Sequence, residues 1–302
     1  MLYEIIHRTA YTYTSDVTIS QHIAHLHPRD TANQHCLRHE TTITPSPALS
    51  RDRTDYFGNA TLFFTLESAH RELIITARSD VLVTEPNFSP PVHTPPWETG
   101  TLTAAGLPLE AHEFVFPSAY VPLLPALTDY ARVSFTPARP LLEAVLDLTQ
   151  RIFTDFTFDP TATTLATPVE RVFKSRRGVC QDFAHLQIAC LRGLGLPARY
   201  VSGYLETQPP PGQIKLTGAD ASHAWVQIHV PGSGWIDLDP TNNTLATGRH
   251  ITVAWGRDYE DVSPLRGVIG GGGKHQLAVA VDVIPKLAAP EPMAQTQSQS
   301  QG

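Results

Sequence analysis

The sequence lacks the features that mark membrane proteins and nucleic-acid-binding proteins. No apolar run reaches the ~20 residues of a membrane-spanning helix, and residues 1–13 do not show the basic and apolar segments of a secretory signal. Acidic residues outnumber basic ones, 29 to 22, and no basic block is longer than Lys174-Ser-Arg-Arg177. A net charge of −7 without a basic cluster argues against binding to phosphate backbones. We therefore expect neither a membrane nor a nucleic acid as a partner.

Cysteine is also scarce, and its pattern points to a reducing compartment. The three cysteines, Cys36, Cys180 and Cys190, cannot all pair within one chain, and none has the Cys-x-x-Cys spacing of redox or zinc motifs. A cytoplasmic location is the simplest interpretation. Cys36 lies in a strand-like run and Cys190 lies ten residues after Cys180 on the same periodic segment, so we interpret both as packing residues.

The composition is that of a globular chain, with 41% hydrophobic and 17% charged residues among 302. Residues 1–85 consist of short alternating runs separated by turn clusters such as Asp55–Asn59, which predicts an antiparallel β domain. Residues 86–128 begin with a proline-rich stretch and are interpreted as a linker or crossing segment. We expect a catalytic core with C-terminal strands at 129–285 and a disordered tail at 286–302.

Helices precede strands within residues 129–285, which is typical of an α+β fold. One helix is predicted to follow Pro140, and a short second one to have Thr167 as its N-cap. A third begins at Cys180 and ends near Gly193 or Gly195. Strand-like runs follow at 198–205, 224–230, 234–239, 250–254 and 276–284. The pattern predicts a cysteine-bearing helix packed on an antiparallel sheet.

Cys180 has the best setting for reactivity among the three cysteines. A thiol in the first helical turn lies beside unpaired backbone N–H groups and the positive end of the helix dipole, which favour the thiolate. His223 and Asp239 follow on two strand-like runs joined by Pro231-Gly-Ser-Gly234. If the residue numbers of paired positions in this hairpin sum to an even number, both side chains share one face and lie directly or diagonally opposite. Asp237 shares the face of Asp239 and is the alternative partner.

These three residues would form a nucleophile, a base and an orienting carboxylate. Cys180 would attack an acyl carbon, His223 would take and return the proton, and Asp239 would hold the imidazole. Each residue alone is weak evidence, because a lone cysteine usually packs in a core and the chain has 14 histidines. His22, His25 and His27 have no acidic or cysteine partner at zinc-ligand spacing, so we expect no metal and no other cofactor.

The order of four motifs resembles the core of the transglutaminase-like superfamily, and most closely its bacterial branch of candidate cysteine proteases. The N-terminal part is similar to the β domain that precedes the core in that branch, through His7–Tyr13, His27–Arg29 and Asp55–Asn59. Segments 256–259 and 261–267 fit the same branch. The four core motifs are Arg177–His185, Gly195–Tyr204, His223–Val226 and Gly234–Thr241.

The resemblance implies a papain-like core, a triad of Cys180, His223 and Asp239, and acyl transfer through a thioester. The chain shows no calcium-binding loop, so calcium activation is not expected. The acceptor stays open between water, as in a cysteine protease or amidase acting on a peptide or protein, and an amine, as in a protein-glutamine transglutaminase. A non-catalytic peptide-binding module is the third alternative, although an intact Cys, His and Asp order argues against it.

Overall fold

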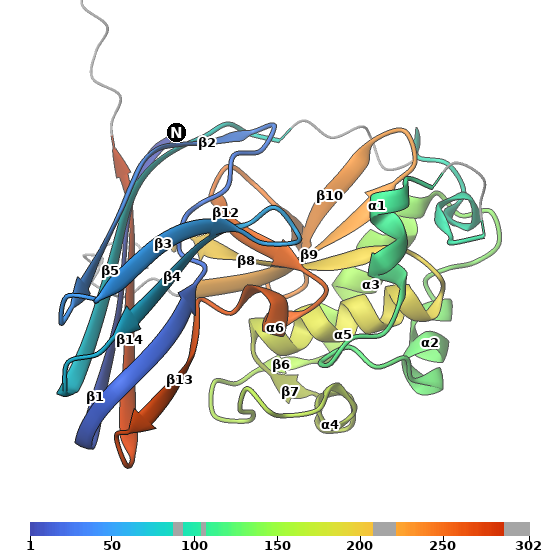
Figure 1. Cartoon of the computed structure of the whole chain (residues 1–302). Helices are drawn as coiled ribbons and strands as arrows, with labels where there is room; N and C mark the ends of the chain where they lie inside the picture. The colour runs from blue at the N-terminus through green and yellow to red at the C-terminus, as the bar shows by residue number, and fades with distance from the viewer. Residues whose placement is uncertain (87–92, 104–106, 208–221, 287–302) are drawn as a thin grey trace, which may run out of the picture.

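The computed structural model describes all residues except 87–92, 104–106, 208–221 and 287–302. The described residues form two antiparallel sheets, with helices packed on the second (Figure 1). The predicted α+β class is therefore confirmed. The tail predicted at 286–302 lies outside the described residues, apart from Lys286 at the end of the last strand.

The first sheet is organised around β1, a strand of 23 residues whose inward and outward positions alternate. Its first half pairs with β5 and β14, and its second half pairs with β4 and β13. The predicted turn Asp55–Asn59 joins β3 to β4, with Gly58 at a φ of 75°. The strands are β1 (Leu2–Ala24), β2 (Gln34–Thr44), β3 (Leu49–Thr54), β4 (Ala60–Leu66), β5 (His70–Val83), β13 (Leu265–Gly271) and β14 (His275–Lys286).

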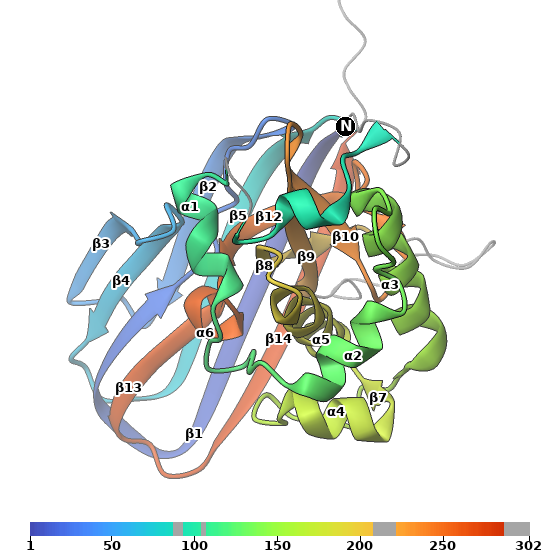
Figure 2. The same cartoon turned by 90° about the vertical axis from the view of Figure 1, so that its right-hand side faces the viewer.

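The end of the chain returns to the first sheet. Strands β13 and β14 pair antiparallel with β1 and lie beside it in Figure 2. The sequence-based division grouped these strands with the catalytic core. Their hydrogen bonds instead place them in the first sheet. Strand β1 is long enough that β14 pairs with its first half and β13 with its second half. The domain boundaries themselves stay a prediction.

The described part of segment 86–128 is helical and partly buried. It contains η2 (Trp97–Gly100), α1 (Leu109–His112) and η3 (Glu113–Val115), and α2 (Pro125–Arg132) begins near its end. Ala111, Phe114 and Val121 are buried. The segment therefore contributes to the packed interior of the protein as well as connecting its two sheets.

The second sheet has the strand order β11-β10-β9-β8-β12. Its strands are β8 (Ala198–Leu205), β9 (Ser222–Val230), β10 (Gly234–Asp239), β11 (Thr244–Leu245) and β12 (His250–Gly256). The helices of this region are α3 (Leu141–Asp155), α4 (Val169–Ser175), α5 (Cys180–Gly193) and α6 (Tyr259–Val262), with a small parallel pair of β6 (Thr157–Phe158) and β7 (Arg177–Gly178).

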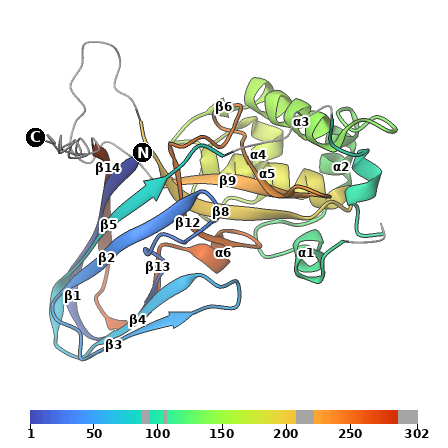
Figure 3. The ribbon, with the colours of Figure 1, turned by 90° about the horizontal axis from the view of Figure 1, so that it is seen from above.

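Seen from above, the second sheet lies between the first sheet and a layer of helices α2–α5, whereas α1 and α6 lie on the opposite side of the second sheet from that layer (Figure 3). Helix α5 packs on β8 and β9, and one apolar core joins Leu148, Leu186 and Val226 across the helix–sheet contact. On the other side, Gln34 exchanges two hydrogen bonds of 2.8 Å with the backbone of Thr252 in the edge strand β12. The first sheet thereby covers backbone groups that an edge strand would otherwise leave unpaired.

One predicted helix start is wrong. Thr167 is not the N-cap of α4, which begins at Val169 after the extended residue Pro168. The Thr167 hydroxyl instead accepts the backbone N–H of Thr164 at 2.9 Å, closing a local turn that leaves it unavailable to the helix. The cysteine-bearing helix was predicted to end near Gly193 or Gly195, and it ends at Gly193.

Among the described residues, no helix is both long enough and apolar enough to cross a membrane.

Candidate active site

Cys180 is the first residue of α5, and the polar groups around it explain why the helix begins there. The carboxylate of Asp182 accepts the backbone N–H of Val179 at 2.8 Å and the hydroxyl of Thr163 at 2.7 Å. This contact pairs the backbone N–H of Val179, the residue that precedes the helix. Burial raises the pKa of Asp182. The half-buried Cys180 side chain therefore lies at the positive end of a 14-residue helix.

The hairpin of β9 and β10 has the register on which the sequence-based pairing depended. Gly234 pairs with Val230 and Leu238 with Val226, so paired residue numbers sum to an even value and His223 lies diagonally across from Asp239. Nε2 of His223 is 2.7 Å from Oδ2 of Asp239. The thiol of Cys180 lies near the imidazole of His223 and contributes, after Asp239, to raising its pKa. The structure thus brings the three predicted site residues together.

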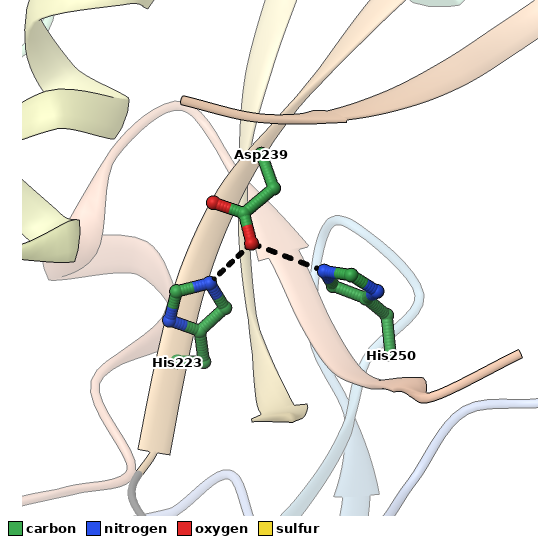
Figure 4. A group of neighbouring side chains, drawn as sticks. All are labelled: His223, Asp239 and His250. Atoms are coloured by element: carbon green, nitrogen blue, oxygen red, sulfur yellow. Dashed lines mark hydrogen bonds and ion pairs between the residues drawn. The ribbon is translucent and has the colours of Figure 1, made fainter. Parts of the chain in front are cut away.

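The carboxylate of Asp239 is fully buried and accepts five hydrogen bonds. Oδ1 accepts the backbone N–H groups of Thr241 and Asn242 at 2.9 and 3.2 Å. Oδ2 accepts Nδ2 of Asn242 at 2.7 Å in addition to Nε2 of His223. The fifth donor is Nε2 of His250 at 3.1 Å, and Figure 4 shows the carboxylate between the two imidazoles.

These contacts shift both titrating partners toward their charged forms. Burial alone would raise the pKa of Asp239, but the hydrogen bonds from His223, His250 and Asn242 outweigh it and hold the pKa below its ordinary value. Burial alone would lower the pKa of His223, but hydrogen bonds with Asp239 and Cys180 outweigh it and raise the pKa to about 10. His223 is therefore poised to carry a proton at neutral pH.

The proton positions follow from the hydrogen-bond partners. A carboxylate can only accept, so Nε2 of His223 carries a proton toward Asp239 and Nδ1 is left for the thiol. One proton can then move between Cys180 and this ring nitrogen without rearranging the heavy atoms. The result is either a neutral thiol and imidazole or a thiolate and imidazolium, which is the arrangement that activates a cysteine nucleophile.

The alternative orienting residue, Asp237, has other partners. Its carboxylate accepts the indole N–H of Trp225 at 2.6 Å and the amide of Gln227 at 2.8 Å. Burial raises the pKa of Asp237. Because Trp225 packs beside His223, with ring centroids 6.1 Å apart, Asp237 acts on the site by holding this indole.

The other two thiols have surroundings that suppress ionisation. Burial raises the pKa of Cys190 to about 12 and that of Cys36 to about 11. All three cysteines are free. Cys36 and Cys190 therefore remain thiols at neutral pH, which fits their interpretation as packing residues.

The histidines that were predicted not to bind a metal, His22, His25 and His27, do not converge on one point. His22 stacks on Phe64, His27 stacks on His39, and His25 contacts Asp55, so the three have separate environments. Within the part of the chain that the structure describes, His223, Asp239 and His250 do converge as possible ligands.

The protons of that converging group argue against a metal. Nδ1 of His250 accepts the backbone N–H of Thr247 at 3.1 Å, so the proton of this imidazole is on Nε2 and points at Asp239. A metal ligand needs a lone pair at that atom. The group fits a hydrogen-bonded network better than a metal site.

Comparison with known proteins identifies the family of the chain. The bacterial transglutaminase-like N-terminal region matches residues 3–82, and the core of the transglutaminase-like superfamily matches residues 129–240. An uncharacterized protein of Mycobacterium tuberculosis is 44% identical over 94% of this chain and 92% of its own length. The chain belongs to the transglutaminase-like superfamily.

Other similar proteins extend the comparison. An uncharacterized protein of Mycobacterium leprae is 33% identical over 92% of this chain and 97% of its own length. A protein-glutamine gamma-glutamyltransferase of Pseudomonas aeruginosa is 32% identical over 47% of this chain but only 22% of its own length. A crystal structure described as a candidate cysteine protease from Cytophaga hutchinsonii has a TM-score of 0.74 at 22% identity, covering 96% and 93% of the two chains, and confirms the fold.

Sequence reasoning missed two residues that contact Asp239, namely His250 and Asn242. Asn242 lies shortly after Asp239 in the sequence, so its side-chain amide could have been recognised as a donor to that carboxylate. His250 gave no such signal, because β12 and β10 are separated in the sheet by β8 and β9. Gly203 of β8 lies between β9 and β12, and an added Cβ there would lie 2.5 Å from the Trp225 ring and 2.2 Å from the Ile251 carbonyl oxygen.

Proposed function

We propose that the protein is a cysteine-dependent acyl-transfer enzyme in which Cys180, His223 and Asp239 act as a triad and water is the usual acceptor. The observation that carries this proposal is the position of His223, whose imidazole lies 2.7 Å from Asp239 and interacts with the nearby Cys180 thiol. The substrate class is a peptide or another amide. Membership of the transglutaminase-like superfamily supports the same chemistry.

The proposed reaction has two halves. In the first, the Cys180 sulfur attacks the acyl carbon, the carbon–nitrogen bond breaks, and the imidazolium of His223 gives its proton to the leaving amine. In the second, His223 takes a proton from water, the oxygen attacks the thioester, and the carbon–sulfur bond breaks. The backbone N–H of Cys180 at the start of α5 is suited to stabilising the oxyanion in both halves.

Transfer to an amine is the second candidate, and one comparison favours it. The Pseudomonas aeruginosa relative that matches half of this chain is named a protein-glutamine gamma-glutamyltransferase. In that reaction a primary amine replaces water in the second half, while Cys180, His223 and Asp239 keep the same tasks. The cytoplasmic location suggested by the free cysteines stays part of the proposal.

The first test compares Cys180→Ala with Cys36→Ala on a panel of peptide and glutamine-containing substrates. We expect Cys180→Ala to lose activity by about 10⁶-fold, as when a triad nucleophile is removed, and Cys36→Ala to retain it. In the folded wild-type protein, iodoacetamide should label Cys180 well before Cys36 and Cys190. Equal labelling of the three thiols would contradict the enzyme assignment and favour a non-catalytic peptide-binding module.

A second measurement separates the two acceptors. Product analysis with and without an added primary amine should show free acid as the main product in both cases if water is the acceptor. Amide formation that grows with amine concentration at the expense of acid would establish the transferase instead. Either result leaves the triad in place and changes only the group that resolves the thioester.

A further inference from the structure

We propose that His250 is a positioning residue for the Asp239–His223 pair: a neutral donor that fixes Oδ2 of Asp239 between two imidazoles and limits how tightly Asp239 holds the proton of His223. The inference rests on the proposed function and deepens it. It adds a fourth side chain to the triad, from a strand that is not a neighbour of the one that bears Asp239.

The two imidazoles that meet Oδ2 of Asp239 are not equivalent. Nδ1 of His250 accepts the backbone N–H of Thr247 at 3.1 Å, so the ring proton lies on Nε2 and is donated to Asp239. The second nitrogen of His223 is left for the nearby thiol, which can exchange a proton with it. His223 is therefore the imidazole of the two that lies beside a proton-exchanging group.

The two imidazoles also lie at different distances from the carboxylate. His223 lies 2.7 Å from Oδ2 and His250 lies 3.1 Å from the same atom. Both contacts are hydrogen bonds to a carboxylate oxygen, and the shorter one comes from His223. The geometry is that of a closer and a more distant donor sharing one carboxylate oxygen.

The surroundings hold His250 in this orientation. The side chain is buried, and its ring meets the Trp225 indole edge-on, with centroids 5.3 Å apart at 78°. The charged groups that face it are Asp239 and, less closely, Asp237, both on β10, and His223 of β9 lies 6.1 Å away between ring centroids. Trp225 therefore packs against both imidazoles while Asp237 anchors its N–H.

Sharing Oδ2 has a chemical consequence with a definite sign. Each donor withdraws part of the carboxylate's charge, so the hydrogen bond from His250 weakens the hold of Asp239 on the proton of His223. Without that donor, the imidazolium would be more stable and would release its proton to a leaving group less readily. Loss of the donor should therefore raise the pH at which His223 deprotonates and slow the acyl-transfer step.

The test uses three variants of His250. His250→Phe and His250→Met remove the donor with two different shapes, so a folding defect in one leaves the other. His250→Gln replaces the ring by an amide that can still donate to Asp239. The matched control is His229→Phe, because His229 is a buried histidine of the same sheet that meets Trp235 edge-on at 5.5 Å, and its Nδ1 has no partner.

Two quantities are measured on each variant. The first is the rate of Cys180 alkylation by iodoacetamide as a function of pH, which needs no substrate and reports the pH at which the imidazolium loses its proton. The second is kcat and KM on the substrate found above. We expect the donor-free variants to show an upper inflection about one pH unit higher and a kcat about 10- to 100-fold lower, with little change in KM.

The outcomes separate the two proposals. The positioning role is supported if His250→Gln restores both the pH inflection of Cys180 alkylation and kcat, while His229→Phe leaves both at their wild-type values. A purely structural residue would change the free energy of unfolding without moving that pH inflection. Wild-type values in the donor-free variants would overturn the role of His250 and leave the triad intact. A wild-type Cys180 that is no more reactive than Cys36 would overturn both proposals together.

Discussion

His25 with Asp55 in the first sheet region and His223 with Asp239 in the second are comparable histidine–aspartate pairs, but of the two histidines only His223 also faces the Cys180 thiol. In the first region, Nε2 of His25 is 3.3 Å from Oδ2 of Asp55, and its Nδ1 is 3.0 Å from the backbone oxygen of Ser263. Both ring nitrogens are thus directed at acceptors, and the imidazole joins the β3–β4 turn to the segment after α6. In the second region, His223 interacts with the Cys180 thiol in addition to Asp239.

The difference shows what a histidine–aspartate pair requires to become reactive. Both aspartates accept several hydrogen bonds, and the pKa of each lies below its ordinary value: burial opposes the shift in both, and hydrogen bonds from histidine outweigh it. The carboxylates therefore do not distinguish the pairs. The third group does, because a carbonyl oxygen can only fix a ring in place whereas a thiol can give it a proton.

The largest expected effect that would test this comparison comes from removing each carboxylate in turn. Asp239→Asn should lower kcat by about 10³- to 10⁴-fold, because the amide can present the wrong tautomer of His223 to the thiol. Asp55→Asn should leave kcat unchanged and lower the free energy of unfolding by about 1–3 kcal/mol through lost charged hydrogen bonds. Steady-state kinetics and denaturant unfolding of both variants give the answer, and comparable losses of kcat would erase the distinction.

A second, smaller effect concerns pH. The folded-state pKa of His223, about 10, exceeds its ordinary value of 6.5. The stability that this ion pair contributes to the folded state is therefore fully present at pH values below 6.5. It is lost as the pH rises through about 10. The rate–pH curve of Cys180 alkylation should show its upper inflection near the higher value and shift downward in Asp239→Asn. An inflection that stays in place in this variant would mean that Asp239 does not set the basicity of His223.

The smallest expected effect compares one strand glycine from each region. Gly203→Ala places a methyl group 2.5 Å from the Trp225 ring, beneath the residues that link β10 to β12. We expect a loss of about 1–3 kcal/mol in the free energy of unfolding and reduced alkylation of Cys180 near neutral pH. Gly270→Ala in β13 is the control, because its nearest neighbour is the end of the Ile19 side chain at 3.0 Å. Equal behaviour of the two variants in chemical denaturation would refute the role assigned to Gly203.

Much of the fold was predictable because it depends on local patterns. The alternating runs of β8, β9 and β10 and the apolar periodicity of α5 are visible in the sequence, and the structure confirms these elements. The pairing of His223 with Asp239 was predictable up to one choice of register, since a short turn joins their strands. The membership of β13 and β14 in the first sheet was not predictable, because antiparallel pairing over more than 240 residues leaves no local signal.

By itself, the sequence determined the order of the site residues, the helix that begins at Cys180 and the hairpin that carries His223 and Asp239, because helix caps and strand alternation act over a few residues. Only the tertiary structure decided that Asp239 and not Asp237 meets His223, and that His250 reaches the same carboxylate from two strands beyond His223. Those contacts depend on how side chains pack over Gly203, and such packing is set by the whole sheet rather than by any local run of residues.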